Sequence, residues 1–363
     1  MSLSIGIVGL PNVGKSTLFN ALTAQQIAAE NYPFCTIDPN VGIVPVPEPR
    51  LEILANICES KNIVPAVVEF FDIAGIVKGA HQGEGLGNEF LKHIGNTDCI
   101  IHVIRDFVDE KVIHVENDVN AIRDKEIIET ELILKDLDTV YKQLTGLEKQ
   151  LRAGRVKQDF VNHVHTLRET LESGKLAMTL SVDPDNLVLF TLRKQLMLLT
   201  DKPMIYVLNT RDHLTIQDLD DKRDKLSIPK TAQLIAVDIK LEYELSQLSQ
   251  LERLEFMNEY GIEATGLEML IRSAYASLGL ISFFTAGNKE VRAWSLVKGS
   301  KAPVAAGVIH SDFEDHFIRA EVCSYDDFVK SGGWLKAKEA GKMRLEGKDY
   351  IVNEGDVIVF HHS

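Results

Sequence analysis

Residues 9–17, GLPNVGKST, are the stretch that decides the fold of this 363-residue chain. They fit the pattern G-x-x-x-x-G-K-[ST], follow an apolar stretch at residues 4–8 and open a helical pattern at residues 16–22. In this strand-to-helix context the glycines let main-chain N–H groups curl around phosphate oxygens, and the helix N-terminus adds positive potential. The sequence therefore predicts a P-loop that binds a nucleotide. Its predicted binding residues are Asn12, Val13, Gly14, Lys15, Ser16 and Thr17.

The residues around the predicted P-loop assign a role to each side chain. We expect Lys15 to reach the β- and γ-phosphates as a catalytic residue and the Ser16 hydroxyl to be a ligand of Mg²⁺. Thr36, in a proline-bounded loop, is the expected second hydroxyl ligand. Asp72 follows the apolar stretch at residues 66–71 and begins a DxxG motif, so it is expected to hold Mg²⁺ through water. The Gly75 amide would then contact the γ-phosphate and sense its loss.

The position after the DxxG motif is informative about hydrolysis. Small GTPases usually place a glutamine there to orient the attacking water, whereas this chain has Ile76, whose side chain cannot donate or accept a hydrogen bond. Another group must position the water. His81 and His114 are the candidates, and for each the alternative is an ordinary hydrogen-bonded histidine. Asn12 is a candidate ligand for K⁺ beside the phosphates, or simply a turn residue.

A base-reading motif is expected after a later strand. Asn209, Thr210, Arg211 and Asp212 follow the apolar stretch at residues 204–208. GTPases carry NKxD at this place, where the aspartate accepts hydrogen bonds from guanine and the lysine stem packs on the purine. This chain keeps the asparagine and the aspartate but has threonine for the lysine. Asn209, Thr210 and Asp212 are therefore predicted base-binding residues, with the choice between adenine and guanine left open.

The pattern along the chain predicts an α/β fold with a mostly parallel sheet. Continuous apolar stretches, which include residues 99–104 and 233–237, alternate with helical patterns. Heptad spacing at residues 133–151 and 160–171, separated by a turn at Gly154, predicts an antiparallel helical hairpin. Short segments punctuated by glycine predict a β-rich C-terminal domain with strands at residues 291–296, 305–309, 318–322, 348–352 and 357–361. The expected domains are a nucleotide domain at 1–105 and 201–280, the helical insertion at 106–200, and the C-terminal domain at 281–363.

The composition of the chain argues against several classes of protein. The chain has 39 Lys+Arg and 53 Asp+Glu, a net charge of −14, which disfavours a general nucleic-acid coat. Its 45% hydrophobic residues argue against disorder, and no apolar run approaches the roughly 18 residues of a membrane span. The four cysteines lie far apart, which fits a reducing compartment. The N-terminus shows no basic segment of a signal peptide, so we expect a cytoplasmic protein.

Together these motifs resemble the YchF / Obg-like ATPase family of P-loop translation factors. The matching segments are residues 9–17, 31–36, 72–75, 83–88, 284–287, 292–294 and 346–350. The resemblance implies a G domain, an inserted coiled-coil hairpin and a C-terminal β-grasp-like TGS domain. It also implies a hydrophobic residue in place of the catalytic glutamine, which Ile76 satisfies, a preference for ATP, and association with the ribosome.

On these grounds we expect a Mg²⁺-dependent ATPase that acts as a slow switch on the ribosome, through its large subunit or rRNA, in translation or stress regulation. Asp212 stands where the family has glutamate, and we favour ATP because the lysine of NKxD is also missing. Basic residues of the C-terminal domain are candidates to meet rRNA phosphates. They are Lys289, Arg292, Lys298, Lys301, Arg319, Lys336, Lys338, Lys342 and Arg344. The alternatives are an Obg-type GTPase, a nucleotide-gated RNA- or protein-binding module with negligible hydrolysis, and a small-molecule kinase.

Overall fold

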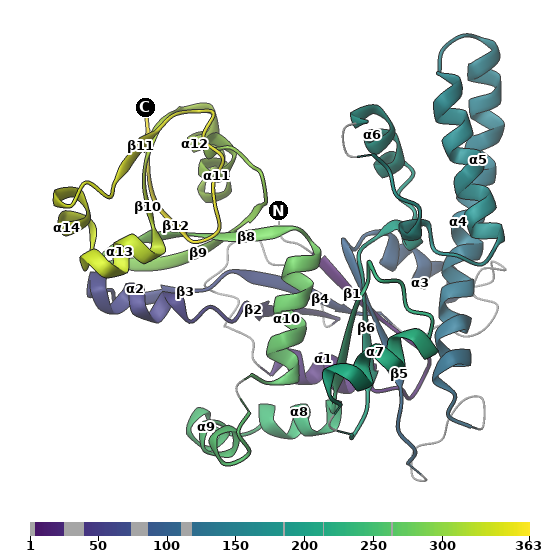
Figure 1. Cartoon of the computed structure of the whole chain (residues 1–363), viewed down its shortest axis with the longest axis horizontal. Coiled ribbons are helices and arrows are strands. Elements are labelled where there is room, and N and C mark those ends of the chain that lie inside the picture. The colour runs from purple at the N-terminus through teal and green to yellow at the C-terminus, as the bar shows by residue number, and fades with distance from the viewer. Residues whose placement is uncertain are drawn as a thin grey trace.

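Two six-stranded sheets organise the described part of the chain, and a long helical hairpin projects from the side of the first (Figure 1). The structure is a computed structural model. It describes residues 4–24, 40–73, 86–109, 118–183, 186–212, 214–262 and 264–363.

The first sheet is the predicted parallel sheet. Its strands are β1 (Ser4–Val8), β2 (Val41–Pro45), β4 (Val67–Asp72), β5 (Cys99–Arg105), β6 (Met204–Asn209) and β7 (Gln233–Val237). The order is β2-β4-β1-β5-β6-β7, and every neighbouring pair is parallel except β2 with β4. Every residue of β5 and β6 is buried. Strands that are covered on both faces read as continuous apolar runs, and for this reason the sequence predicted them correctly.

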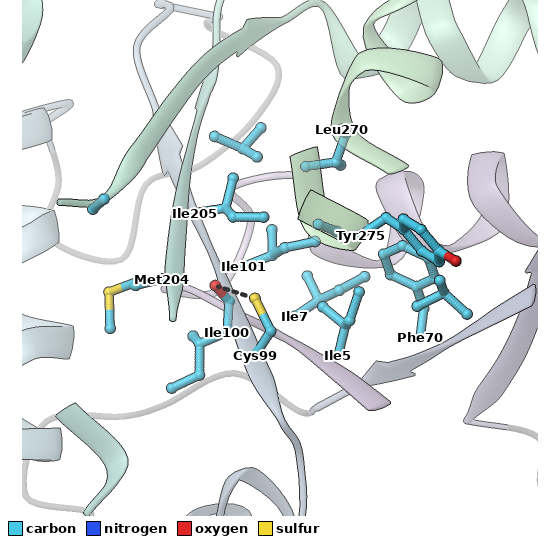
Figure 2. Packing of buried hydrophobic residues seen from close by; sticks show 14 of the residues in the cluster. Ile5, Ile7, Phe70, Cys99, Ile100, Ile101, Met204, Ile205, Leu270 and Tyr275 are labelled. Carbon is cyan, nitrogen blue, oxygen red and sulfur yellow. Dashed lines mark hydrogen bonds between the residues drawn. The ribbon is translucent and has the colours of Figure 1, made fainter. Parts of the chain in front are cut away.

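The pleat of these strands divides the apolar side chains between two faces. Because side chains alternate along a strand, Ile5 and Ile7 of β1 share a face with Ile101 of β5, which pairs in register with Ile205 of β6. Figure 2 shows these isoleucines in one cluster with Phe70, Leu270 and Tyr275. Leu270 and Tyr275 are buried residues of α10 (Gly266–Ser277), so this helix seals one face of the sheet.

The remaining helices of this unit follow the strands. They are α1 (Lys15–Thr23), α3 (Leu86–Gly95), α7 (Ile216–Lys225), α8 (Ile239–Ser246) and α9 (Gln250–Glu259). Local signals start several of them. Thr215 caps the N-terminus of α7 and Ser249 that of α9, each in a capping box in which Asp218 or Glu252 accepts a hydrogen bond from the N–H of the cap residue. Such boxes satisfy main-chain donors that have no partner inside the helix.

The helical insertion contains the antiparallel hairpin that the heptad spacing predicted. Helix α4 (Ala121–Arg152) and helix α5 (Gln158–Glu172) lie side by side (Figure 1) and bury their seam residues, among them Val140, Leu144 and Val164. The insertion continues through η3 (Ala177–Thr179), α6 (Leu187–Gln195) and η4 (Leu199–Asp201). Among the helices of the described stretches, none combines the length and apolar character that a membrane span requires.

The second sheet contains β3 (Asn62–Val64), β8 (Leu280–Ala286), β9 (Glu290–Val297), β10 (Phe317–Ser324), β11 (Arg344–Glu346) and β12 (Asp356–His362). Their order is β11-β10-β12-β8-β9-β3. Helices α11 (Ala302–Ile309), α12 (Ser311–Asp315), α13 (Tyr325–Ser331) and α14 (Trp334–Glu339) connect these strands, and α2 (Arg50–Cys58) precedes β3. The predicted strands at 291–296, 318–322 and 357–361 are present.

Two strand predictions in this region were wrong. Residues 305–309 form the second half of α11, because Ala302, Ala305 and Ala306 recur at helical spacing on the buried side and Pro303 sits in the first turn, where its missing N–H costs nothing. Residues 348–352 form a turn and a single bridge between Ile351 and Lys301 rather than a strand.

Candidate nucleotide-binding site

The residues of the predicted P-loop form a tight turn between β1 and α1. Gly14 has a φ of 106° and stands at the N-terminus of α1, and Asn12 also has a positive φ, of 63°. A Cβ at Gly14 would lie 2.7 Å from Nδ2 of Asn209. The turn therefore needs glycine at Gly14 both for its backbone conformation and for the close approach of Asn209.

Lys15 begins α1 with its ammonium group folded into the turn. The side chain is 7% exposed, and Nζ donates a hydrogen bond to the main-chain oxygen of Leu10 at 2.8 Å. Burial lowers the pKa of Lys15 to about 8, and the charge of Asp72 opposes part of that shift. A desolvated ammonium with one carbonyl partner still has two N–H groups to offer an anion.

Asp72 lies at the carboxyl end of β4, beside the P-loop strand, because it pairs in register with Ile7 of β1. Its side chain is half-buried and acts electrostatically on Lys15. Ser16 is exposed in the first turn of α1. A hydroxyl and a carboxylate beside a phosphate-binding turn form the oxygen donor set that Mg²⁺ prefers, so the described residues fit this ion.

A cavity of about 320 Å³ opens next to the P-loop. Its lining residues are Asn12, Gly14, Thr17, Phe107, Asp109, Asn209, Arg211, Asp238, Ile239 and Lys240. Asn209 fixes the geometry from the end of β6. Its Nδ2 donates to the main-chain oxygen of Val13 at 2.9 Å, and its Oδ1 accepts from the main-chain N–H of Ile239 at 3.3 Å.

The other two predicted base-binding residues, Thr210 and Asp212, are not part of this lining. Thr210 is buried, and its main-chain N–H donates to the oxygen of Val237 at 3.1 Å. Its Oγ1 accepts from the main-chain N–H of Asp212 at 3.2 Å, while the Asp212 side chain is exposed. Arg211, which lies between them in the sequence, lines the cavity.

Sequence reasoning missed the cluster that follows β5. Two guanidinium groups lie over the Phe107 ring, that of Arg105 at 4.6 Å and that of Arg211 at 5.0 Å from the ring centroid. Arg211 also pairs with Asp109 at 2.5 Å. Arg105 is 1% exposed and its Nε donates to the oxygen of Phe107 at 3.1 Å. Ligands of open α/β sheets bind beyond the carboxyl ends of the strands, and that rule would have pointed to residues 106–109.

The loop after β7 was missed for the same reason. Asp238 caps the N-terminus of α8, and its Oδ1 accepts hydrogen bonds from the main-chain N–H groups of Lys240 and Leu241, both at 3.1 Å. This cap holds Ile239 and Lys240 against the cavity. The sequence feature that could have predicted this loop is an aspartate, a favoured N-cap residue, directly after a buried strand.

Four predicted site residues, Thr36, Gly75, His81 and His114, lie outside the described residues, as does Ile76. The structure thus brings together Lys15, Ser16 and Asp72 at one end of the sheet and Asn209 against the P-loop. The second hydroxyl ligand of Mg²⁺, the γ-phosphate sensor and the water-positioning histidines stay predictions.

Comparisons with known proteins show which family the chain is similar to. A family model described as a 50S ribosome-binding GTPase matches residues 4–136. The YchF-GTPase_C model, described as a protein of unknown function, matches residues 280–363. Proteins named ribosome-binding ATPase YchF are similar over full length, at 48% identity in Bacillus subtilis and 45% in Haemophilus influenzae, with 100% of each chain covered.

A solved structure shows the same arrangement of the whole chain. The YchF GTPase of Schizosaccharomyces pombe superposes with a TM-score of 0.85 at 36% identity, over 99% of this chain and 98% of that one. The predicted combination of a nucleotide-binding sheet, a helical insertion and a C-terminal domain is thereby confirmed. The chain belongs to the YchF family of P-loop nucleotide hydrolases.

Proposed function

We propose that this protein is a Mg²⁺-dependent ATPase that acts as a slow nucleotide switch on the ribosome. The observation that carries the proposal is the hydrogen bond from Asn209 to Val13, which joins the base-side cavity to the phosphate-binding turn. A phosphate site and a base-sized cavity in direct contact suit a purine nucleoside triphosphate. The relatives named as ribosome-binding ATPases support ATP and the ribosome as substrate and partner.

In this proposal each residue of the P-loop has a task. The N–H groups of the turn and of the first turn of α1 grip the phosphate oxygens, and Lys15 exchanges its bond to Leu10 for the β- and γ-phosphates. Ser16 and Thr36 would hold Mg²⁺ directly and Asp72 would hold it through water, and the bound ion would supply positive charge beside the phosphates. His81 or His114 positions the water in place of a glutamine, and loss of the γ-phosphate releases Thr36 and Gly75.

Replacing Lys15 with alanine tests the phosphate assignment. The variant should bind ATP at least tenfold more weakly, or lose turnover, because the buried ammonium supplies the only side-chain cation that the described P-loop residues 9–17 offer the phosphates. Lys230→Ala removes an exposed lysine outside the cavity lining and serves as the control. Isothermal titration with ATP and a phosphate-release assay give both quantities. Wild-type turnover in the Lys15 variant would refute the assignment.

The choice of ATP over GTP is tested by competition for a fluorescent ATP analogue at physiological Mg²⁺. ATP should displace the analogue at lower concentration than GTP, because Thr210 replaces the lysine that packs on guanine and the exposed Asp212 does not line the cavity. Tighter displacement by GTP would establish the Obg-type alternative. Such a result would leave the phosphate site as described.

The switch proposal needs turnover, and a binding module without hydrolysis is the alternative. Turnover should be slow in the free protein and rise when ribosomes or K⁺ are added, because Ile76 provides no hydrogen bond for the attacking water. His114→Ala should lower this turnover and leave ATP affinity unchanged. Absent turnover under all of these conditions, with ATP still bound, would favour the nucleotide-gated module.

Ribosome association is proposed from the relatives and from the basic residues of the C-terminal domain. Three of these residues already hold ion pairs inside the domain: Lys301 with Asp349, Lys342 with Asp327, and Arg344 with Glu346. Sedimentation of the protein with ribosomes should fall as salt rises, because contacts to phosphates release counterions. Equal sedimentation at low and high salt would exclude phosphate contacts as the main attraction.

A further inference from the structure

The chain leaves the nucleotide-binding sheet between the two predicted γ-phosphate-sensing motifs and builds part of the second sheet. Strands β2 and β4 pair in the first sheet, whereas the segment between them contains α2 and β3. Strand β3 pairs in parallel with β9, with Asn62, Ile63 and Val64 opposite residues 290–292. The predicted sensing residues Thr36 and Gly75 lie just before β2 and just after β4 in the sequence.

Helix α2 covers one face of this second sheet. Along β8, Phe283 belongs to the C-terminal domain's own core, with Ile281 and the alanines of α11. Its neighbour Phe284 instead belongs to the large core that includes Leu51 and Leu54 of α2. The alternation continues in β9 and β12, where Val291, Ala293 and Val357 share that large core. If the C-terminal domain moved away from α2, these buried apolar side chains would meet water.

Arg50, the first residue of α2, adds ion pairs to the apolar contact between α2 and the second sheet. Its guanidinium pairs with Glu48 at 2.5 Å and with Glu354, and it lies over the Phe284 ring at 4.8 Å from the centroid. Glu354 is held in turn, since its other carboxylate oxygen accepts from the main-chain N–H of Ser282 at 2.8 Å. One side chain therefore contacts the segment that follows β2, the loop before β12 and the face of β8.

The connections around this segment are short. Only Pro65 and Ala66 separate β3 from β4, and the main-chain N–H of Val46, directly after β2, donates to the oxygen of Ala66 at 2.8 Å. Strand β4 is fixed against β1 by four register pairs that end at Asp72. The connections are too short to absorb a displacement, so a shift of β2 and β4 along the first sheet would also move α2 and β3.

We infer that the segment β2–α2–β3–β4 couples the nucleotide site to the C-terminal domain, with Arg50 as the positioning residue that locks the segment to that domain. This inference rests on the proposed function, because it requires the triphosphate to be sensed next to β2 and β4. Coupling between two sites is reciprocal. The nucleotide changes how firmly β3 is held against β9, and the attachment of the C-terminal domain changes the relative affinity for triphosphate and diphosphate.

Hydrogen exchange of the full-length chain, measured by mass spectrometry, tests this inference. Three states are compared: no nucleotide, ADP with Mg²⁺, and a non-hydrolysable ATP analogue with Mg²⁺. In the wild type, amides of β3 and β9 should exchange at least threefold differently between the two nucleotide states. In Arg50→Ala this difference should disappear, and the ratio of the Kd values for the two nucleotides should change at least threefold.

Two further variants keep the result interpretable. Arg253→Ala is the matched control, because Arg253 is also half-buried and paired, with Glu268 at 2.9 Å, but joins α9 to α10. It should keep the wild-type exchange difference. Arg50→Lys keeps the charge without the planar fork and should keep part of the difference, which also covers the case that Arg50→Ala does not fold.

The outcomes separate the inference from the proposed function. If P-loop amides respond to both nucleotides while β3 and β9 exchange identically in all states, the inference is overturned and the proposed function stands. An unchanged exchange difference in folded Arg50→Ala also overturns it. If no amide responds and no nucleotide binds, the proposed function fails, and the inference fails with it.

Discussion

The side-chain amide of Asn209 donates from Nδ2 to the main-chain oxygen of Val13 at 2.9 Å, and its Oδ1 receives the N–H of Ile239. One side chain at the end of β6 thereby holds both the phosphate-binding turn and the loop after β7. In this structure, the asparagine of the base-reading motif links the P-loop to the start of α8 through hydrogen bonds.

Asn209→Ala should weaken nucleotide binding and stability together. The substitution leaves a buried carbonyl and a buried N–H without their partner, which costs about 1–3 kcal/mol. ATP affinity should fall roughly tenfold, the equivalent of about 1.4 kcal/mol, and thermal melting should occur at lower temperature. Calorimetry and a melting curve measure the two effects. Unchanged affinity and melting temperature would show that the two hydrogen bonds carry no net free energy.

Gly14→Ala should abolish nucleotide binding. The φ of 106° strains any residue with a Cβ, and that Cβ would sit 2.7 Å from Nδ2 of Asn209. Gly154→Ala is the control, since Gly154 has a φ of 67° and nothing within 4 Å of the added atom. The control should lose about 1–2 kcal/mol of stability from the left-handed backbone and bind ATP normally. ATP binding by Gly14→Ala at wild-type affinity would contradict the crowding argument.

The affinity for ATP should fall as pH rises through about 8. The pKa of Lys15 is lowered to about 8 by burial, so above this pH the free protein carries a neutral amine where the phosphates need an ammonium. Binding then requires uptake of a proton. Titrations between pH 6.5 and 9.5 in buffers of different ionisation enthalpy should show that uptake, and Lys15→Arg should lose the pH dependence. A flat profile for the wild type would place the Lys15 pKa well above this range.

His102→Leu should make the protein more resistant to acid. His102 is fully buried in β5, and its Nδ1 finds no hydrogen-bond partner in the described residues. Burial is the main reason that its pKa is lowered from 6.5 to about 3, and Lys125 and Lys15 add to the shift. Because the folded-state pKa is below the unfolded value, the histidine contributes stability above pH 6.5 that is lost as pH falls towards 3.

The expected loss in the free energy of unfolding is about 1.4 kcal/mol for each pH unit below the unfolded-state pKa of 6.5. At pH 5 the wild type should have lost about 2 kcal/mol through this group, while His102→Leu should not show that loss. Urea unfolding at pH 8 and at pH 5 gives the difference directly. Equal losses in both proteins would mean that His102 is not responsible for the acid sensitivity.

Local sequence patterns determined a large part of this molecule. The glycines and lysine of residues 9–17 specify the turn before α1, continuous apolar runs specify β5 and β6, and heptad spacing specifies α4 and α5. Each signal involves residues within a few positions of one another. The strand predictions at 305–309 and 348–352 failed because short segments of five residues fit a helix or a turn as well as a strand.

Only the tertiary structure decided what joins these parts. Strand β3 has three residues and no periodicity to read, and its partner β9 lies more than two hundred positions further along the chain. The pairing of Arg50 with Glu354 and the placing of Arg211 over Phe107 likewise depend on segments that meet only after folding. Contacts of this kind leave no local pattern, because their free energy comes from burial and charge pairing between distant surfaces rather than from the preference of a short segment.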